Sequence, residues 1–198
     1  MEIQSCGAAQ EVTGSCHLIK VGKQTVLLDC GLIQGRKKDE NRNRTPFPFD
    51  PAKLDAVILS HAHIDHSGRL PLLIKNGFNG PIYTHKASAD LCDTLLKDSA
   101  YLNYKNTQWE NKRRERRGKK PLEPLYERED AAKALKLFDT LEYGEKKEIL
   151  PGVTVKLSDA GHIVGSSVVE LWLVEKKLQR KVVFSGCLLY TSPSPRDS

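Results

Sequence analysis

The amino-acid sequence predicts an α/β protein in which helices pack outside a β-sheet. Short apolar runs rich in β-branched residues occupy the first 60 positions, two blocks with helical spacing follow, and strand-like runs return after residue 148. Strands, then helices, then strands again are typical of a sheet covered by helices. With 198 residues, of which 39% are hydrophobic, the chain is long enough for one domain with a sizeable core.

The early apolar runs are predicted to be strands. Residues 16–21 and 24–29 flank Gly22-Lys23, which is a hairpin turn signal. The run 56–59 is apolar without alternation, as in a strand that is buried on both faces. Residues 81–84 predict one more short strand.

Helices are predicted where apolar residues recur every three or four positions. The sequence predicts a short helix over 67–75, a long one over 87–112 and a third over 129–141. Pro121 and Pro124 separate the last two, because proline interrupts a helix. The remaining predicted elements are strands over residues 153–157, 167–174 and 181–185.

The basic excess belongs to one element. The chain has 31 Lys and Arg against 25 Asp and Glu, and residues 105–120 hold eight basic and two acidic side chains, so the remainder has 23 of each. A polyanion is therefore expected at this element or at an active-site cleft, and not over the whole surface. A solvated helix face is the alternative interpretation of residues 112–120.

The cysteine content and the N-terminal sequence indicate the cellular compartment of the protein. Five cysteines without a CxxC pair predict neither a disulfide framework nor a structural zinc ribbon, and a reducing cytoplasm fits best. The first 16 residues lack the pattern of a signal peptide, and no apolar run is long enough to span a bilayer. The sequence predicts a cytoplasmic protein without membrane contact, with four cysteines as small buried hydrophobes: Cys6, Cys16, Cys30 and Cys92.

The chemistry is concentrated in an HxHxDH cluster directly after a predicted buried strand, His61-Ala62-His63-Ile64-Asp65-His66. A shuffled chain of this composition would show the pattern about three times in ten thousand. His61 and His63 lie two apart in extended chain, so they project to the same side and can share one metal. Asp65 and His66 follow where the chain turns toward a helix, and they can hold a second metal nearby.

Two residues outside the cluster are further candidates. His162 lies on a glycine-flanked loop between two predicted strands, and three imidazoles are the usual minimum for a zinc position with an open site for water. A solvated loop histidine is the alternative. Asp29 ends a predicted strand, where it could orient ligand imidazoles or simply form a turn. His17 and His85 are not assigned to metal.

These segments resemble the metallo-β-lactamase superfamily, and more narrowly its β-CASP branch of RNA and DNA nucleases. The HxHxDH cluster is typical of the superfamily, whereas Val12-Thr13-Gly14-Ser15 and residues 160–166 indicate the branch. The resemblance covers residues 1–186. It implies an α/β fold of the αββα metallo-β-lactamase sandwich type, which this chain contains only as its N-terminal half.

The resemblance also implies a site with two Zn²⁺ ions. By position, His61, His63 and His162 would ligate one zinc and Asp65 and His66 the other, while Asp29 supports the site. Asp65, His66 and Asp29 are the residues expected to serve catalysis. The implied reaction is hydrolysis of phosphodiester bonds in single-stranded RNA by a hydroxide that the two metals activate.

The sequence departs from the family pattern at Cys187. An aspartate that bridges both metals is expected after Ser185-Gly186, and Cys187 stands there instead. Residues 187–198 form a low-complexity tail that looks foreign to the family and is expected to be disordered. The β-CASP insertion does not follow. The intact parent is therefore expected to be an enzyme, and this chain to be inactive.

Two other functions stay open at this point. A metallo-β-lactamase-fold hydrolase of a small thioester or lactone also carries HxHxDH, but it closes its ligand set without a cap insertion. A catalytically silent subunit of an RNA-processing complex typically loses ligands, and the intact HxHxDH cluster argues against it. The sequence does not distinguish endonuclease from exonuclease action, and it leaves the RNA preference and the oligomeric state open.

Overall fold

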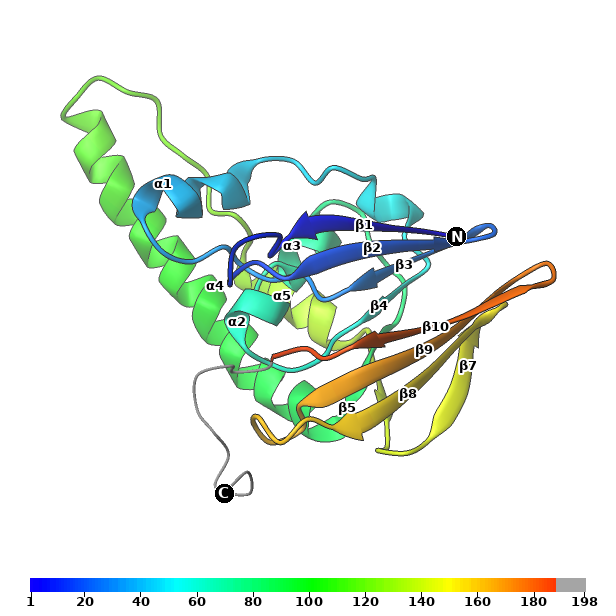
Figure 1. Ribbon diagram of the computed structural model, residues 1–198. Helices are drawn as coiled ribbons and strands as arrows, with labels where there is room; N and C mark the ends of the chain where they lie inside the picture. Colours follow the sequence, from blue (N-terminus) through cyan, green and yellow to red (C-terminus); the bar gives the residue numbers. More distant parts are fainter. Residues whose placement is uncertain (188–198) are drawn as a thin grey trace.

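The computed structural model describes residues 1–187 as two stacked β-sheets with helices on one side (Figure 1). The first sheet has six strands in chain order: β1 (Glu2–Gly7), β2 (Cys16–Val21), β3 (Gln24–Leu28), β4 (Ala56–Ile58), β5 (Ile82–His85) and β6 (Phe138–Leu141). The second is antiparallel in the order β10-β9-β8-β7: β7 (Lys146–Leu150), β8 (Val153–Asp159), β9 (Ser167–Glu175) and β10 (Leu178–Phe184).

Helices connect the parallel part of the first sheet. Strands β1 to β3 pair antiparallel, whereas β3 to β6 pair in parallel. Parallel neighbours need crossover connections, which helices usually supply. The helices are α1 (Lys37–Glu40), α2 (Ile64–Ser67), α3 (Leu70–Lys75), α4 (Lys86–Glu115) and α5 (Arg128–Leu135), with 3₁₀ turns η1 (Asn41–Arg44) and η2 (Pro51–Lys53).

Two apolar cores lie on the two faces of the first sheet. Ile58 and its neighbours pack between the sheets against residues such as Val155 and Leu171. Val57 and Leu59 point to the other face, where Leu96 of α4 belongs to the same core. Strand β4 is thus buried on both faces, as its non-alternating pattern predicts. Helix layer, sheet and sheet are three layers of the αββα sandwich, which confirms the predicted fold class and its partial character.

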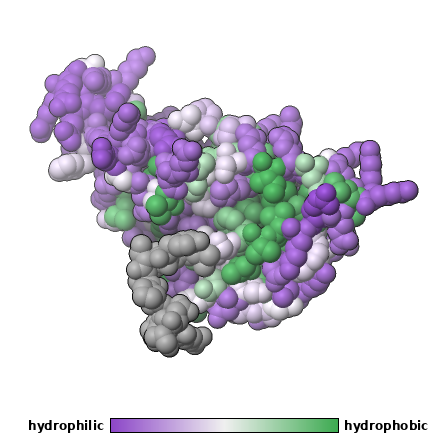
Figure 2. Space-filling view, in the orientation of Figure 1, coloured by the Kyte–Doolittle hydropathy of each residue, from purple (hydrophilic) through white to green (hydrophobic). Residues whose placement is uncertain are grey.

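The two sheets are open along the side where β1 and β10 form their edges. Ile3 of β1 and Val183 of β10 are more than half exposed. Figure 2 shows apolar surface in the opening between the sheets on this side. Exposed apolar surface of this kind is common at interaction sites.

Strand pairing shortens one predicted helix and adds one strand that the sequence does not predict. Residues 138–141 were predicted as the end of a helix, but they form β6, which pairs in parallel with β5 and buries Leu141. This tertiary pairing outweighs the helical spacing of the sequence, so α5 ends at Leu135. Strand β1 was not predicted, because it is an exposed edge strand of largely polar residues.

The predicted helix over 67–75 is two helices, α2 and α3, and the first begins at Ile64. The break falls at Gly68, which packs so closely on α2 that an added Cβ would lie 2.5 Å from the carbonyl oxygen of Ile64. Asp65 and His66 therefore stand on a helix. The long predicted helix, α4, runs three residues beyond its predicted end and carries part of the basic stretch.

The sequence also makes predictions about the cysteines, membrane contact and the C-terminal tail. All five cysteines have free thiols; Cys16, Cys30 and Cys92 are buried, and Cys6 is partly exposed. None of the described helices combines the length and apolar character needed to cross a bilayer. Except for Cys187, the tail predicted to be disordered lies outside the described residues, and the domain boundary after residue 186 stays a prediction.

Candidate metal centre

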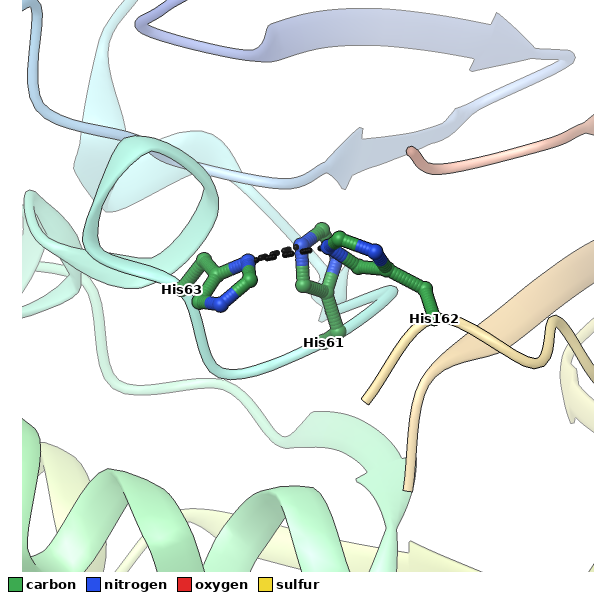
Figure 3. Close-up of side chains that lie close together, drawn as sticks. All are labelled: His61, His63 and His162. Carbon is green, nitrogen blue, oxygen red and sulfur yellow. Dashed lines mark hydrogen bonds between the residues drawn. The ribbon is translucent and has the colours of Figure 1, made fainter. Parts of the chain in front are cut away.

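Three imidazoles from two distant segments converge at one end of the stacked sheets (Figure 3). His61 and His63 follow β4, and His162 lies on the loop between β8 and β9. The His63 Nδ1 atom lies 3.1 Å from His61 Nε2 and 3.1 Å from His162 Nε2. The structure thus brings together the three residues that the sequence proposes for one metal.

The convergence of these three nitrogens fits a zinc ion. A tetrahedral zinc with bonds of about 2.0–2.1 Å places neighbouring nitrogen ligands about 3.3 Å apart, close to the two distances found from His63 Nδ1. A single N–H at His63 Nδ1 can hydrogen-bond to only one of its two neighbours. A cation between the rings would instead accept the lone pairs of all three.

His61 is held in the tautomer that a metal requires. Ser60 Oγ donates its only proton to Asp29 Oδ2 at 3.0 Å, so it must accept a hydrogen bond from His61 Nδ1, also at 3.0 Å. The Nε2 atom of His61 therefore keeps its lone pair and faces His63. Burial lowers the pKa of His61 to about 3, with the nearby His66 adding to the effect, so the ring is neutral at physiological pH.

Hydrogen bonds within the His162 loop and from neighbouring elements hold the loop in place. Ser166 Oγ accepts from the backbone N–H groups of His162 and Ile163 at 3.2 and 3.1 Å. The Tyr143 hydroxyl donates to the Ser166 carbonyl at 2.8 Å, and Ser88 Oγ donates to that of Gly165 at 2.7 Å. Burial, together with the neighbouring imidazoles, lowers the pKa of His162. The ring is thereby presented to the site as a neutral ligand.

Asp29 connects several of these side chains. Its carboxylate is fully buried and accepts from Ser15 Oγ, the Ser60 N–H, Ser60 Oγ and His66 Nδ1 at 2.7 to 3.0 Å. Burial by itself would raise the pKa of Asp29, but the hydrogen bond and positive charge of His66 outweigh it and leave the pKa lowered. Asp29 thus orients imidazoles and is not itself a member of the three-imidazole cluster.

His66 and Asp65 form a second group on α2. Because Nδ1 of His66 donates to Asp29, its Nε2 is the atom free for a metal, and it lies 3.7 Å from Asp65 Oδ2. Burial lowers the pKa of His66, but the hydrogen bond and charge of Asp29 outweigh burial and raise it overall. The pair has one nitrogen and one carboxylate to offer, and its metal role stays a prediction.

Residue 187 follows a glycine that packs against the site. Gly186 packs on Ser60, so that an added Cβ would lie 3.2 Å from the Ser60 Cβ atom. Burial raises the pKa of the Cys187 thiol, and the negative charge of Asp65 raises it further. The position at which the family pattern expects an aspartate thus directly follows a glycine that packs on Ser60, and it feels the charge of Asp65.

The two histidines that were not assigned to metal lie outside the cluster. His17 Nδ1 lies 2.8 Å from Ser5 Oγ, and its ring packs edge-on against Phe184. His85 caps helix α4 by accepting from the Ala87 N–H, and its ring stacks on Tyr143. Sequence reasoning missed Ser60, Ser166 and Tyr143. Ser60 directly precedes the cluster, but nothing local in the sequence indicates that its hydroxyl meets Asp29.

The fold and this cluster agree with the comparison of sequences. The pattern of the metallo-beta-lactamase superfamily matches residues 9–198, and the chain belongs to that superfamily. Two curated relatives are of the β-CASP type, which confirms the narrower resemblance.

Both relatives are much longer than this chain. Ribonuclease TTHA0252 of Thermus thermophilus is 41% identical over 188 residues, which is 95% of this chain and 38% of that protein. Transcription termination factor FttA of Thermococcus kodakarensis is 35% identical over 179 residues, covering 86% of this chain and 26% of the factor.

Solved structures share the fold at lower sequence identity. A metallo-beta-lactamase from Cronobacter sakazakii superposes with a TM-score of 0.54 at 17% identity, over 92% of this chain and 60% of that one. A B3 metallo-beta-lactamase with an active-site glutamic acid superposes with a TM-score of 0.53 at 15% identity, over 98% and 65%. These likenesses concern the fold alone.

Proposed function

We propose that this chain is the N-terminal part of a zinc-dependent β-CASP ribonuclease that hydrolyses phosphodiester bonds in single-stranded RNA. The observation that carries the proposal is the convergence of His61, His63 and His162 on one point. The 41% identity to a protein named as a ribonuclease supports the substrate class. The five free thiols are consistent with a reducing cytoplasm as the site of action.

The chain's own residues have separate roles in this proposal. His61, His63 and His162 would hold one zinc, and Asp65 and His66 would contribute to a second. Bound zinc supplies positive charge that polarises the phosphate and lowers the pKa of water. Asp29 keeps the proton of His66 on Nδ1 and, through Ser60, that of His61 on Nδ1, so both Nε2 atoms stay available.

The substitution of the bridging residue limits what this chain does alone. Two cations a few ångströms apart repel strongly unless an anion lies between them. Cys187 has its pKa raised, so at neutral pH it supplies less negative charge than an aspartate would. We therefore propose that the intact parent is the nuclease and that this 198-residue chain is inactive.

Metal analysis tests the proposed centre. The purified chain is loaded with zinc, desalted and measured by elemental analysis beside His63→Ala, with His17→Ala as the matched control. We expect zinc in the wild type and in His17→Ala, and its loss in His63→Ala, because His63 Nδ1 lies 3.1 Å from the Nε2 atoms of both other imidazoles. Equal zinc content in wild type and His63→Ala would overturn the centre.

Substrate tests separate the reaction classes in the full-length parent. We expect zinc-dependent cleavage of single-stranded RNA and no turnover of thioesters or lactones. Preferential thioester or lactone hydrolysis would favour the other enzymatic function. A zinc-loaded parent that cleaves none of these substrates would favour a silent subunit.

A further inference from the structure

A groove of about 650 Å³ lies between helix α4 and the segment that carries α1 and η1. One wall is a stripe along α4 made by Leu102, Asn106, Trp109 and Arg113. These residues are spaced by four, three and four positions, so they share one face of the helix. Lys37 and Arg44 line the groove from the opposite segment.

Trp109 is the aromatic residue of that stripe and is largely exposed. Its side chain is 72% exposed, although tryptophan is usually buried for most of its surface. An exposed indole on the wall of a groove offers a flat face on which a nucleobase can stack. Such stacking tolerates any base sequence, because every base has a π-face.

Cations gather at the same end of the groove. Arg113 and Arg114 line it, and the exposed basic stretch 112–120 continues from them. Figure 2 shows this end of α4 and the loop after it as a projecting hydrophilic surface. The Lys37 ammonium pairs with Glu110 at 2.6 Å and neutralises that carboxylate.

Two more carboxylates line the groove, Glu40 and Asp98. Asp98 stands 15 residues before Arg113 on α4, which corresponds to about 22 Å along the helix axis. The positive end of the groove is therefore well separated from Asp98. The phosphates of a bound nucleic acid would therefore contact arginine side chains beside Trp109.

The groove and the candidate metal centre share one segment of the chain. Ile64 lines the groove and stands in the chain between the predicted ligands His63 and Asp65, which do not line it. A strand bound along α4 that continued past Ile64 would approach the histidine cluster. An aromatic platform, cations beside it and a route to the cluster are the features expected where a nuclease holds its substrate outside the cleavage point.

We propose that this groove binds a segment of single-stranded RNA, with a base stacked on Trp109 and phosphates contacting Arg113 and Arg114. The inference rests on the proposed function and adds a binding site away from the metals. It also assigns a role to the basic stretch 112–120, which the metal centre does not explain. Binding there requires no metal.

Tryptophan fluorescence tests the site directly. Trp172→Phe leaves Trp109 as the only tryptophan, since the chain has two. We expect an oligouridylate of 12 nucleotides to quench its emission in the presence of a chelator. In unlabelled binding assays, Trp109→Ala should weaken affinity about tenfold, within the range for one lost base stack. Tyr104→Ala is the matched control, because Tyr104 is also exposed on α4 but does not line the groove.

Salt dependence tests the phosphate contacts. Arg113→Gln should flatten the plot of log affinity against log salt by about 0.7, the share of one phosphate contact in a single strand. Oligouridylate binding that neither quenches Trp109 nor changes in Trp109→Ala and Arg113→Gln would overturn the groove and leave the ribonuclease proposal standing. An absence of RNA binding by every variant, and by the full-length parent, would overturn both.

Discussion

His66 Nδ1 donates a hydrogen bond of 2.7 Å to the fully buried carboxylate of Asp29, across 37 positions of the chain. This contact joins the end of β3 to α2. It decides which nitrogen of His66 is free, and the same carboxylate reaches His61 through Ser60. Asp29 is thus a structural support of the whole site as well as of one ligand.

Asp29→Ala should lower the free energy of unfolding by about 3–5 kcal/mol, because it leaves the buried partners of the carboxylate unsatisfied. Ser15→Ala removes only one of the four hydrogen bonds that the Asp29 carboxylate accepts, and it should lower the free energy of unfolding by about 1 kcal/mol. Urea unfolding of the metal-free chain measures both. Equal effects of the two substitutions would contradict the central role of Asp29.

Acid should destabilise the metal-free chain partly through His61. Folding lowers the pKa of this imidazole to about 3, whereas the unfolded chain takes up the proton near pH 6.5. The unfolded state therefore binds more protons between these values, and stability falls as the pH drops below about 6.5. His66 has a raised pKa and acts in the opposite sense, losing its contribution as the pH rises.

Comparison with His61→Gln isolates this contribution. The difference in unfolding free energy between wild type and variant should be constant above about pH 7 and shrink toward pH 4. Urea titrations at a series of pH values in chelator provide the measurement. A difference that does not change with pH would show that His61 has an ordinary pKa.

Tyr143→Phe should weaken zinc binding about tenfold, at the low end of the effect of residues that orient ligands. The substitution keeps the stacking on His85 but removes the hydroxyl that holds the Ser166 carbonyl and, with it, the His162 loop. Competition with a chromophoric chelator measures affinity, and the visible spectrum of the cobalt-substituted chain reports the ligand geometry.

Tyr126→Phe is the control for that experiment. It also removes a hydroxyl hydrogen bond of 2.8 Å, here to Ser99, but in the core on the helix side of the first sheet. It should cost about 1 kcal/mol of stability and leave zinc affinity unchanged. Matching losses of zinc affinity in both variants would mean that Tyr143 acts only through general stability.

Cys187→Asp should raise zinc content from about one to about two ions per chain, because a carboxylate at the position where the family pattern expects the bridging aspartate can neutralise the repulsion between two metals. Cys187→Ala should stay at about one. Elemental analysis after desalting gives the count. Zinc-dependent RNA cleavage by the unmodified chain, abolished by His63→Ala, would contradict its predicted inactivity and point to a metal-bridging thiolate.

The hydrophobic pattern of the sequence was most informative for strands that are buried on both faces. Strand β4 has apolar residues on both faces, and its pattern predicts it directly. Strand β6 has no such pattern, and its pairing with β5 depends on a neighbour more than 50 positions away. Edge strand β1 exposes most of its residues, so hydrophobicity could not indicate it.

The sequence by itself indicated the candidate ligands and part of their geometry, since two histidines two positions apart in extended chain project to the same side. It could only suggest His162, which lies 99 positions from His63. The tertiary structure decided that the three imidazoles meet, that Ser60 and Asp29 set the tautomer of His61, and that Tyr143 supports the His162 loop. These contacts depend on how the two sheets stack, and a hydroxyl or carboxylate carries no periodic signal of the partner it will find in the folded chain.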